Sequence, residues 1–308
     1  MFDNVTLKVF GLPKDYSPSK NAKKMHRIGA HYCRYKLNNL KLIQNYDCLT
    51  ICGSLAKYLQ DENITSLNRE KVKMSIRKLE DDIALNLKKA IICSVEFGAS
   101  IITKEKPFEY LNLFENTKWL VRVEYSKSTG VETVNYTTPT GAFEFIGYDK
   151  VKEMLDKKQE IPLLFNGANV LRLEYKIRTK RGIETKFKGG LSAYNLFDEK
   201  VYRRFQMLFF TAYNGINKMG RLVYVNKSEK VTQTELTKIQ AEQYRQSFPK
   251  DYRYSIQQLN EAGKLSPYTL ERIRAENNGM GNDIYVSDRN DLIKELDALV
   301  YDRVTFGD

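Results

Sequence analysis

Hydrophobic and polar residues follow two different periods along the chain. From Val5 to Phe10 they alternate one by one, as in a half-buried strand, and the alternation stops at Gly11-Leu12-Pro13. From Val72 to Ile83 the apolar residues recur every three or four positions behind Asn68, a residue that often caps a helix N-terminus. The two periods together predict an α+β protein. Hairpin signals at Asn45–Asp47 and Lys127–Gly130 add the expectation of a central, mainly antiparallel sheet flanked by helices.

The stretch from Ile91 to Thr103 is a second alternating strand. Its odd-numbered apolar residues, Cys93 among them, are expected on the core face, and Ser94, Glu96 and Gly98 on the other. One carboxylate among small residues leaves room for a metal ion or a nucleic-acid backbone. A solvent-facing strand with a single charge explains the pattern equally well.

A third alternating strand runs from Asn169 to Arg178. Its polar face carries four charged residues, namely Arg172, Glu174, Lys176 and Arg178. A carboxylate flanked by cations can belong to a ladder of ion pairs, or it can be a metal ligand inside a phosphate-binding groove. Lys180 and Arg181 continue the positive charge in a predicted turn.

Tyr148 ends another predicted strand, and a helix follows it directly. Asp149 is a natural N-cap for this helix, and Lys150 and Glu153 fall in its first turns. A tyrosine at such a junction is reachable from solvent but held by a rigid element. With a cation two residues on and a carboxylate five residues on, Tyr148 is the best candidate in the chain for a positioned nucleophile or acid.

The character of the sequence changes after the aromatic-rich helix predicted from Asp198 to Lys218. The remainder is polar and predicts helices at Thr234 to Ser247, Tyr254 to Ala262 and Asp288 to Tyr301. We therefore expect a first domain over residues 1–220 and a helical C-terminal domain over residues 221–308.

The charge of the chain indicates a polyanionic partner. Its 50 Lys and Arg against 38 Asp and Glu give a formal net charge of +12, and half of that excess lies between Lys150 and Gly190. Nucleic acid is the first candidate partner and an acidic membrane surface the second. A basic host proteome or simple solubility would explain the charge without a partner.

Several other classes of protein are disfavoured. The sequence has no apolar run near the ~20 residues needed to span a bilayer and no signal-peptide pattern at its start, so we expect a cytoplasmic protein without membrane contact. The four cysteines form no paired Cys-x-x-Cys clusters, and Cys48 and Cys52 are expected to be small core residues in a reducing compartment. His26 and His31 are too far apart in sequence for a His-hydrophobic-His pair and are expected to be ordinary surface or packing residues.

The three strands, taken together, resemble a known family. Val95 to Ala99, Gly147 to Glu153 and Leu171 to Arg178 are similar, in order and spacing, to the gene II and gene X replication initiators of filamentous phages. They are more distantly similar to the rolling-circle initiators of staphylococcal plasmids. The resemblance extends to Gly53–Leu59 and Asn195–Asp198 and covers roughly residues 1 to 215. It implies a fold like that of Rep nickases.

The resemblance also implies an activity and roles for residues. It implies a replication endonuclease that nicks one DNA strand at a phage or plasmid origin and stays joined to the 5′ end through a tyrosine, which starts rolling-circle replication. Tyr148 matches the tyrosine of the family's Tyr-x-Lys-x-x-Glu motif and would be the nucleophile, and Lys150 would orient or neutralise the scissile phosphate. Glu96, at a position that is aspartate in the phage proteins, and Glu174 would hold Mg²⁺ or Mn²⁺, with Glu153 as a third candidate.

The expected partner is single-stranded or supercoiled origin DNA in a bacterial host cytoplasm. The residues that would grip it are Arg172, Lys176, Arg178, Lys180 and Arg181. A host helicase, a host polymerase and a second copy of the chain are further candidate partners. Two alternatives remain open at this point: a non-catalytic nucleic-acid-binding protein, and a metal-dependent nuclease that uses water as its nucleophile.

Overall fold

The computed structural model describes residues 2–18, 22–28, 32–117, 120–127, 130–218, 221–224, 256–269, 271, 284–287 and 291–305. The chain divides into two compact units, Met1–Ile216 together with Glu295–Asp308, and Asn217–Lys294. The last residues, expected with the second domain, therefore belong to the first unit. The predicted helix from Thr234 to Ser247 lies outside the described residues, as does His31.

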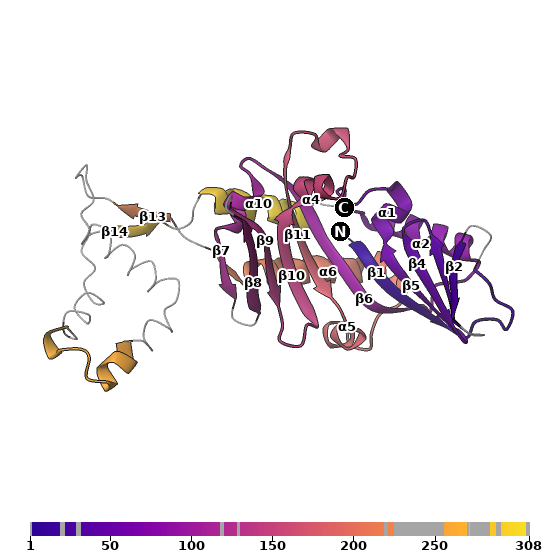
Figure 1. The fold of residues 1–308 in the computed structure, drawn as a ribbon, viewed down its shortest axis with the longest axis horizontal. Coiled ribbons are helices and arrows are strands. Elements are labelled where there is room, and N and C mark those ends of the chain that lie inside the picture. The colour runs from indigo at the N-terminus through magenta and orange to yellow at the C-terminus, as the bar shows by residue number, and fades with distance from the viewer. Residues whose placement is uncertain are drawn as a thin grey trace. The chain divides into compact units, whose positions relative to one another are not determined.

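A large antiparallel sheet forms the centre of the first unit (Figure 1), as the sequence predicted. In its described part, the sheet has ten strands, in the spatial order β2 (Lys23–Ile28), β3 (Tyr32–Leu37), β4 (Leu40–Asn45), β5 (Cys48–Ser54), β1 (Phe2–Phe10), β6 (Ile91–Thr103), β11 (Asn169–Ile177), β10 (Phe143–Asp149), β9 (Gly130–Thr137) and β8 (Val121–Lys127).

The two halves of this sheet follow the same route. β1 and β6 pair with each other at the centre. After each of them the chain moves to an outer edge, at β2 or β8, and returns strand by strand until β5 or β11 lies beside the strand from which it started. The centre of the sheet is consequently where side chains from both halves meet.

Helices and short strands connect and cover the sheet. Among the described residues, the helices include α1 (Leu55–Gln60), α2 (Arg69–Ile83), α3 (Pro107–Leu111), α4 (Lys150–Asp156), α5 (Lys180–Lys186), α6 (Glu199–Asn214) and α10 (Asp291–Thr305), with 3₁₀ turns at Leu163–Phe165 and Ala193–Phe197. The shorter strands are β7 (Phe114–Thr117), β12 (Ile216–Lys218), β13 (Arg221–Tyr224) and β14 (Ile284–Ser287). The turn predicted at Lys180 is instead the start of α5, because Thr179 caps a helix there.

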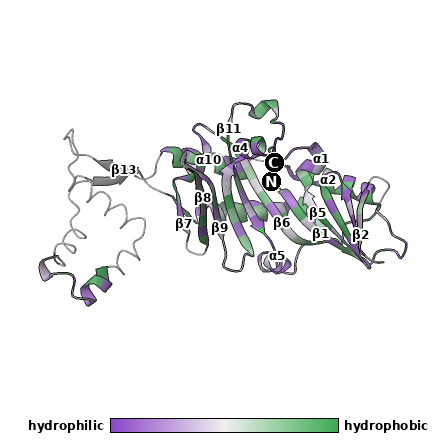
Figure 2. Ribbon diagram, viewed as in Figure 1, coloured by the Kyte–Doolittle hydropathy of each residue, from purple (hydrophilic) through white to green (hydrophobic). Residues whose placement is uncertain are grey.

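One face of the sheet is apolar and packs against the long helices. Phe205 of α6 lies 4.8 Å from Phe97 between ring centroids, and Phe209 lies 5.8 Å from Phe145. The helical stripe predicted on α2 is buried as well. Figure 2 shows apolar and polar residues alternating along the central strands. Because the apolar side chains point toward the helices, the opposite face receives the polar ones.

The predicted alternation in β6 is wrong at Cys93. Thr6 pairs with Ser94 but Leu7 pairs with Ile92, so a bulge leaves Cys93 without a residue opposite it. Ile92 is buried in its place, and Cys93 is half-buried. From Val95 onward the residues of β6 lie on the predicted faces of the sheet, and Glu96 is therefore on the polar face.

Candidate functional site

Tyr148 lies at the end of β10, where the strand passes directly into α4. Asp149 caps this helix as predicted, with its Oδ1 accepting a hydrogen bond from the backbone N–H of Lys152 at 2.9 Å. The hydroxyl of Tyr148 donates a hydrogen bond of 2.9 Å to Oε1 of Glu174 on the neighbouring strand β11. The predicted passage from a strand directly into a capped helix at Tyr148 is present in the structure.

The surroundings keep Tyr148 protonated. Burial raises the pKa of its hydroxyl above the ordinary value, and the charge of Glu174 raises it further, whereas Arg172 lowers it only in part. The ammonium of Lys150 lies 6.0 Å from the centre of the tyrosine ring and is paired with Glu153 instead. In this state Tyr148 is therefore a hydrogen-bond donor, and its proton has one defined acceptor.

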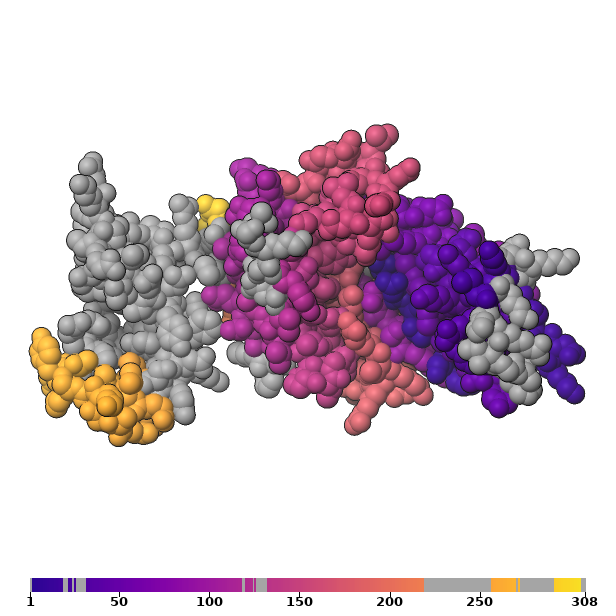
Figure 3. Space-filling view, in the orientation of Figure 1, coloured from indigo at the N-terminus to yellow at the C-terminus, as the bar shows by residue number. Residues whose placement is uncertain are grey.

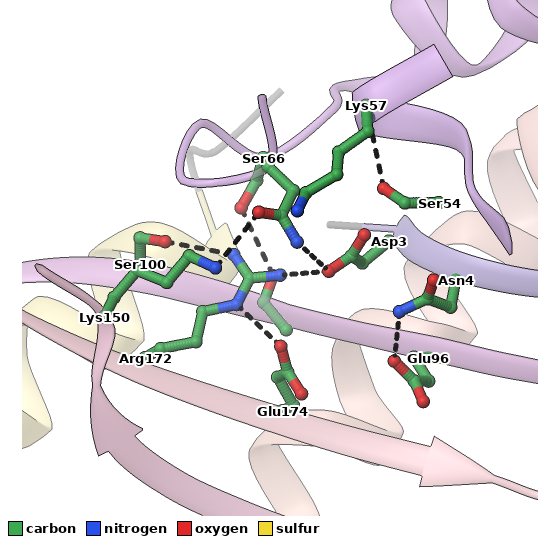
Figure 4. A network of polar contacts seen from close by, with 12 residues as sticks. Asp3, Asn4, Ser54, Lys57, Ser66, Glu96, Ser100, Lys150, Arg172 and Glu174 are labelled. Atoms are coloured by element: carbon green, nitrogen blue, oxygen red, sulfur yellow. Dashed lines mark hydrogen bonds and ion pairs between the residues drawn. The ribbon is translucent and has the colours of Figure 1, made fainter. Parts of the chain in front are cut away.

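Glu174 is held in place by the most deeply buried guanidinium of the network. Arg172 is 1% exposed, donates from Nε to Oε1 of Glu174 at 3.1 Å, and donates from Nη1 to Ser100 at 3.0 Å. Its Nη2 lies 3.6 Å from Oδ2 of Asp3 (Figure 4). Burial alone would raise the pKa of Glu174, but Arg172 and Lys176 outweigh it and lower the pKa to about 2. Glu174 is thus a fixed, ionised acceptor.

Lys150 is the buried centre of a second branch of the network. It is 1% exposed, and its Nζ donates to Oδ1 of Asn63 at 3.0 Å and to Oε2 of Glu153 at 2.8 Å. Asn63 in turn donates to Oδ2 of Asp3 at 2.8 Å. The second oxygen of Glu153 pairs with Lys157. Both oxygens of Glu153 are therefore occupied by lysines.

Glu96 and Glu174 face each other across Lys176. Nζ of Lys176 lies 3.3 Å from Oε1 of Glu96 and 3.3 Å from Oε2 of Glu174. Asn4 donates to the other oxygen of Glu96 at 2.6 Å. Lys176 and Glu96 are directly opposite in the pairing of β11 with β6, which explains why the three charges meet. The two predicted metal ligands thus converge on one point.

The remaining predicted DNA-binding residues lie beyond this point. Arg178 is exposed, but its Nε donates at 3.0 Å to the buried Glu144, which its Nη2 also contacts. Lys180 and Arg181 are exposed on α5, and Lys180 pairs with Glu184 at 3.4 Å. The structure therefore places two predicted DNA contacts, Arg172 and Lys176, inside the network and the other three nearer to solvent.

A polar cavity of about 780 Å³ opens beside Tyr148. Three of its lining carboxylates, Glu96, Glu153 and Glu174, come from the second half of the sheet (β6 to β11 and α4), and the buried Asp3 comes from the first half (β1 to β5 and α1). The first half also contributes Lys41 and Lys57, for which no carboxylate partner occurs among the described residues. In the space-filling view the indigo N-terminal strand lies recessed between the violet and pink parts of the chain (Figure 3). The cavity thus carries carboxylates that are largely paired with cations, together with two lysines that have no carboxylate partner among the described residues.

Several residues of the network were not singled out from the sequence, among them two acidic residues and one asparagine. Asp3, Asn63 and Glu144 are all far in sequence from the residues they contact. The sequence did contain a signal for Asp3. By alternation it falls on the same strand face as the apolar residues Val5 and Leu7, yet it carries a charge. A register shift between Phe2 and Val5 accompanies its turn into the network.

The donor set fits a hard divalent cation in part. Carboxylate oxygens are the ligands that Mg²⁺ and Mn²⁺ prefer, and Glu96 and Glu174 present two of them to one point. Oδ1 of the buried Asp3 has no hydrogen-bond partner, so one more oxygen of the network is uncommitted. Within the described ranges, no group of three or more His, Cys, Asp or Glu side chains is arranged to hold a metal. The same residues contain no helix long and apolar enough to cross a membrane.

Comparison with known proteins identifies the family. The family model for the N-terminal part of the phage replication-associated protein, the gene II protein, matches residues 3–194, which is more than half of the chain. The chain belongs to this family. The resemblance to the replication proteins of filamentous phages is thereby confirmed, and the matched residues of this replication-associated protein include Tyr148 and both carboxylates that converge on Lys176.

Solved structures show only a distant likeness to this replication-associated protein. A rolling-circle replication initiator protein from Geobacillus stearothermophilus is 10% identical with a TM-score of 0.39, over 79% of this chain and 96% of that one. The di-domain ARO/CYC protein StfQ of the steffimycin biosynthetic pathway is 10% identical with a TM-score of 0.19, over 68% and 94%. Likeness at this level carries no argument about function. No curated protein matches significantly.

Proposed function

We propose that this replication-associated protein nicks one strand of origin DNA with Tyr148 as the nucleophile and so initiates rolling-circle replication. The observation that carries the proposal is the hydrogen bond from the Tyr148 hydroxyl to Glu174 beside a polar cavity. A nucleophile paired with an oriented acceptor, itself fixed by a third group, is the arrangement expected for covalent catalysis. Arg172 is that third group.

The chemistry balances with the residues present. Oη of Tyr148 attacks the scissile phosphorus, and the bond from phosphorus to O3′ breaks. The DNA then remains joined through its 5′ phosphate to the tyrosine. Oε1 of Glu174, which accepts the phenolic hydrogen bond of 2.9 Å, takes the phenolic proton and, because the pKa of Glu174 is lowered to about 2, gives it up again, so that the released 3′ oxygen takes up a proton and becomes a hydroxyl.

Glu96 and Glu174 are the residues that would hold Mg²⁺ or Mn²⁺. When bound there, the ion would polarise the scissile phosphate and offset the charge of the transition state. Glu153 fits this role less well because Lys150 and Lys157 take both of its oxygens. We assign it instead to positioning Lys150, which in turn holds Asn63 against Asp3.

The burial of the cations divides their roles. Arg172 is too buried to contact DNA and would act by fixing Glu174. The DNA strand whose phosphate reaches Tyr148 would lie against the side of the cavity that carries Lys41 and Lys57. These two lysines can bind phosphates without first breaking an ion pair with a carboxylate of the described residues. Lys180 and Arg181 on α5, with Arg178, extend the basic surface.

The remainder of the proposal concerns partners. Residues 221–308 would contribute origin recognition or assembly, although the part of them after Lys294 packs with the first unit. A host helicase and a polymerase that extends the 3′-hydroxyl would act after the nick, and a second copy of the chain would be needed if termination uses another tyrosine. These roles follow from the family and stay predictions.

A covalent adduct tests the proposal. Wild-type protein incubated with Mn²⁺ and single-stranded or supercoiled origin DNA should give a protein–DNA species that survives denaturing electrophoresis. Tyr148→Phe should give none, while Tyr175→Phe, a buried tyrosine that does not line the cavity, should still give it. Cleavage without an adduct would replace the proposal with a nuclease that uses water, and binding without cleavage would replace it with a non-catalytic protein.

A further inference from the structure

Lys176 stands where a divalent ion would stand. Its ammonium lies 3.3 Å from one oxygen of Glu96 and 3.3 Å from one oxygen of Glu174. Its side chain is 16% exposed, and that of Glu174 is 5% exposed, so water screens these contacts only weakly. A metal ion bound by the same two carboxylate oxygens would need the position that the ammonium of Lys176 now occupies. The ion and the ammonium therefore exclude each other.

We infer that Lys176 is the internal counter-ion of the metal-free site and that a divalent ion must displace it. The inference rests on the proposed function for the identity of the site, because it takes Glu96 and Glu174 as the metal-binding pair. With Lys176 between them the three groups carry a net charge of −1. With a divalent ion in its place the two carboxylates are neutralised, and the ammonium becomes free.

The displaced ammonium has a nearby use. Lys176 lines the cavity beside Tyr148, together with Lys41 and Lys57. A phosphate of the bound strand is the anion available there once the two carboxylates hold the ion. Metal binding and DNA binding would then assist each other through one side chain, and by linkage each would raise the affinity of the other by the same factor.

Other cations of the network cannot play this part. Arg172 is 1% exposed and fixed by Asp3, Ser100 and Glu174 together. Lys150 is equally buried and points to Asn63 and Glu153. Lys176 has two carboxylate contacts and a long flexible stem that reaches the cavity, which suits a group that leaves and returns.

The test is Mn²⁺ binding by the DNA-free protein, followed by electron paramagnetic resonance or calorimetry rather than by activity. Lys176→Met should tighten Mn²⁺ binding on the order of tenfold, because the competing charge is gone. Lys78→Met is the matched control: it breaks an ion pair of 2.9 Å with Asp82 on α2, away from the cavity, and should leave Mn²⁺ affinity unchanged. Lys176→Gln keeps N–H donors without the charge and serves if the methionine variant does not fold.

A second measurement follows the coupling. In wild type, Mn²⁺ should raise the affinity for single-stranded DNA, and in Lys176→Met this gain should be reduced or lost. Unchanged or weaker Mn²⁺ binding in both Lys176 variants would overturn the inference. Suppose that the Lys176 variants do not bind Mn²⁺ more tightly but that Glu96→Gln and Glu174→Gln abolish Mn²⁺ binding. The proposed metal site would then stand, and only the role of Lys176 as its counter-ion would be refuted. If those two variants bind Mn²⁺ like wild type, the metal site fails as well.

Discussion

Replacing Glu174 by Gln should destabilise the protein by an amount that depends on pH. In the folded chain the pKa of Glu174 is lowered from 4.5 to about 2. A lowered pKa contributes stability above the unfolded value, and this contribution is lost as pH falls through the folded value. A difference of about 2.5 pKa units corresponds to about 3 kcal/mol at pH 7, falling to about 1 kcal/mol at pH 3.

The physical source of this stabilisation is the pairing of Glu174 with Arg172 and Lys176. In the glutamine variant these two cations lose one carboxylate, and Arg172 keeps only Asp3 as an anionic partner among the described residues. The loss of one member of a buried pair costs about 3–5 kcal/mol in comparable cases, which agrees with the value from the pKa.

The assay is urea denaturation of wild type and Glu174→Gln, followed by circular dichroism at several pH values between 7 and 3. The difference in unfolding free energy should be largest at pH 7 and shrink below pH 4.5. Glu184→Gln on the exposed surface of α5 is the control and should show a difference below about 1 kcal/mol throughout. A Glu174→Gln difference that is constant with pH, or below about 1 kcal/mol at pH 7, would refute the assignment of Glu174 as a buried, ionised ion-pair partner.

Two further substitutions probe how the site is built. Gly98→Ala should destabilise the protein by about 1–3 kcal/mol or more and reduce adduct formation, because a Cβ would lie 2.0 Å from the carbonyl oxygen of Leu173 and 2.8 Å from Cα of Glu174. Wild-type stability in a thermal melt would contradict that close approach. Asp3→Asn should cost about 1–3 kcal/mol, since Arg172 loses a buried anion while the shape is kept. An unchanged urea midpoint would show that Asp3 contributes no charge to the network.

Local patterns were sufficient to predict the elements that carry the chemistry. Alternation on β11 and at the end of β10 places Glu174 and Tyr148 on the polar face, and Asp149 signals the helix that follows. These features depend on a few consecutive residues, because side-chain direction in a strand repeats every second residue. The neighbours of Tyr148 already made it a candidate nucleophile or acid, and the family resemblance favoured the nucleophile.

The pairings between distant segments could not be predicted in the same way. Lys176 contacts Glu96 only because β11 and β6 are neighbours in one particular register. The alternation within each strand predicts neither which strands pair nor their register. The ion pair of Arg172 with Asp3 joins the two halves of the sheet, and the bulge at Cys93 is a feature of the β1–β6 pair. The charged face of β11, read as a basic groove, is for this reason largely an internal ion-pair network.

The most direct test of the account is to find which residue carries the DNA. Protein incubated with Mn²⁺ and origin DNA should be digested with nuclease and protease, and the nucleotide-bearing peptide identified by mass spectrometry. If Tyr148 is the nucleophile, a single peptide with a nucleotide 5′-phosphate on Tyr148 is expected. A nucleotide on any other residue, or DNA cleaved with no modified peptide, would contradict the account.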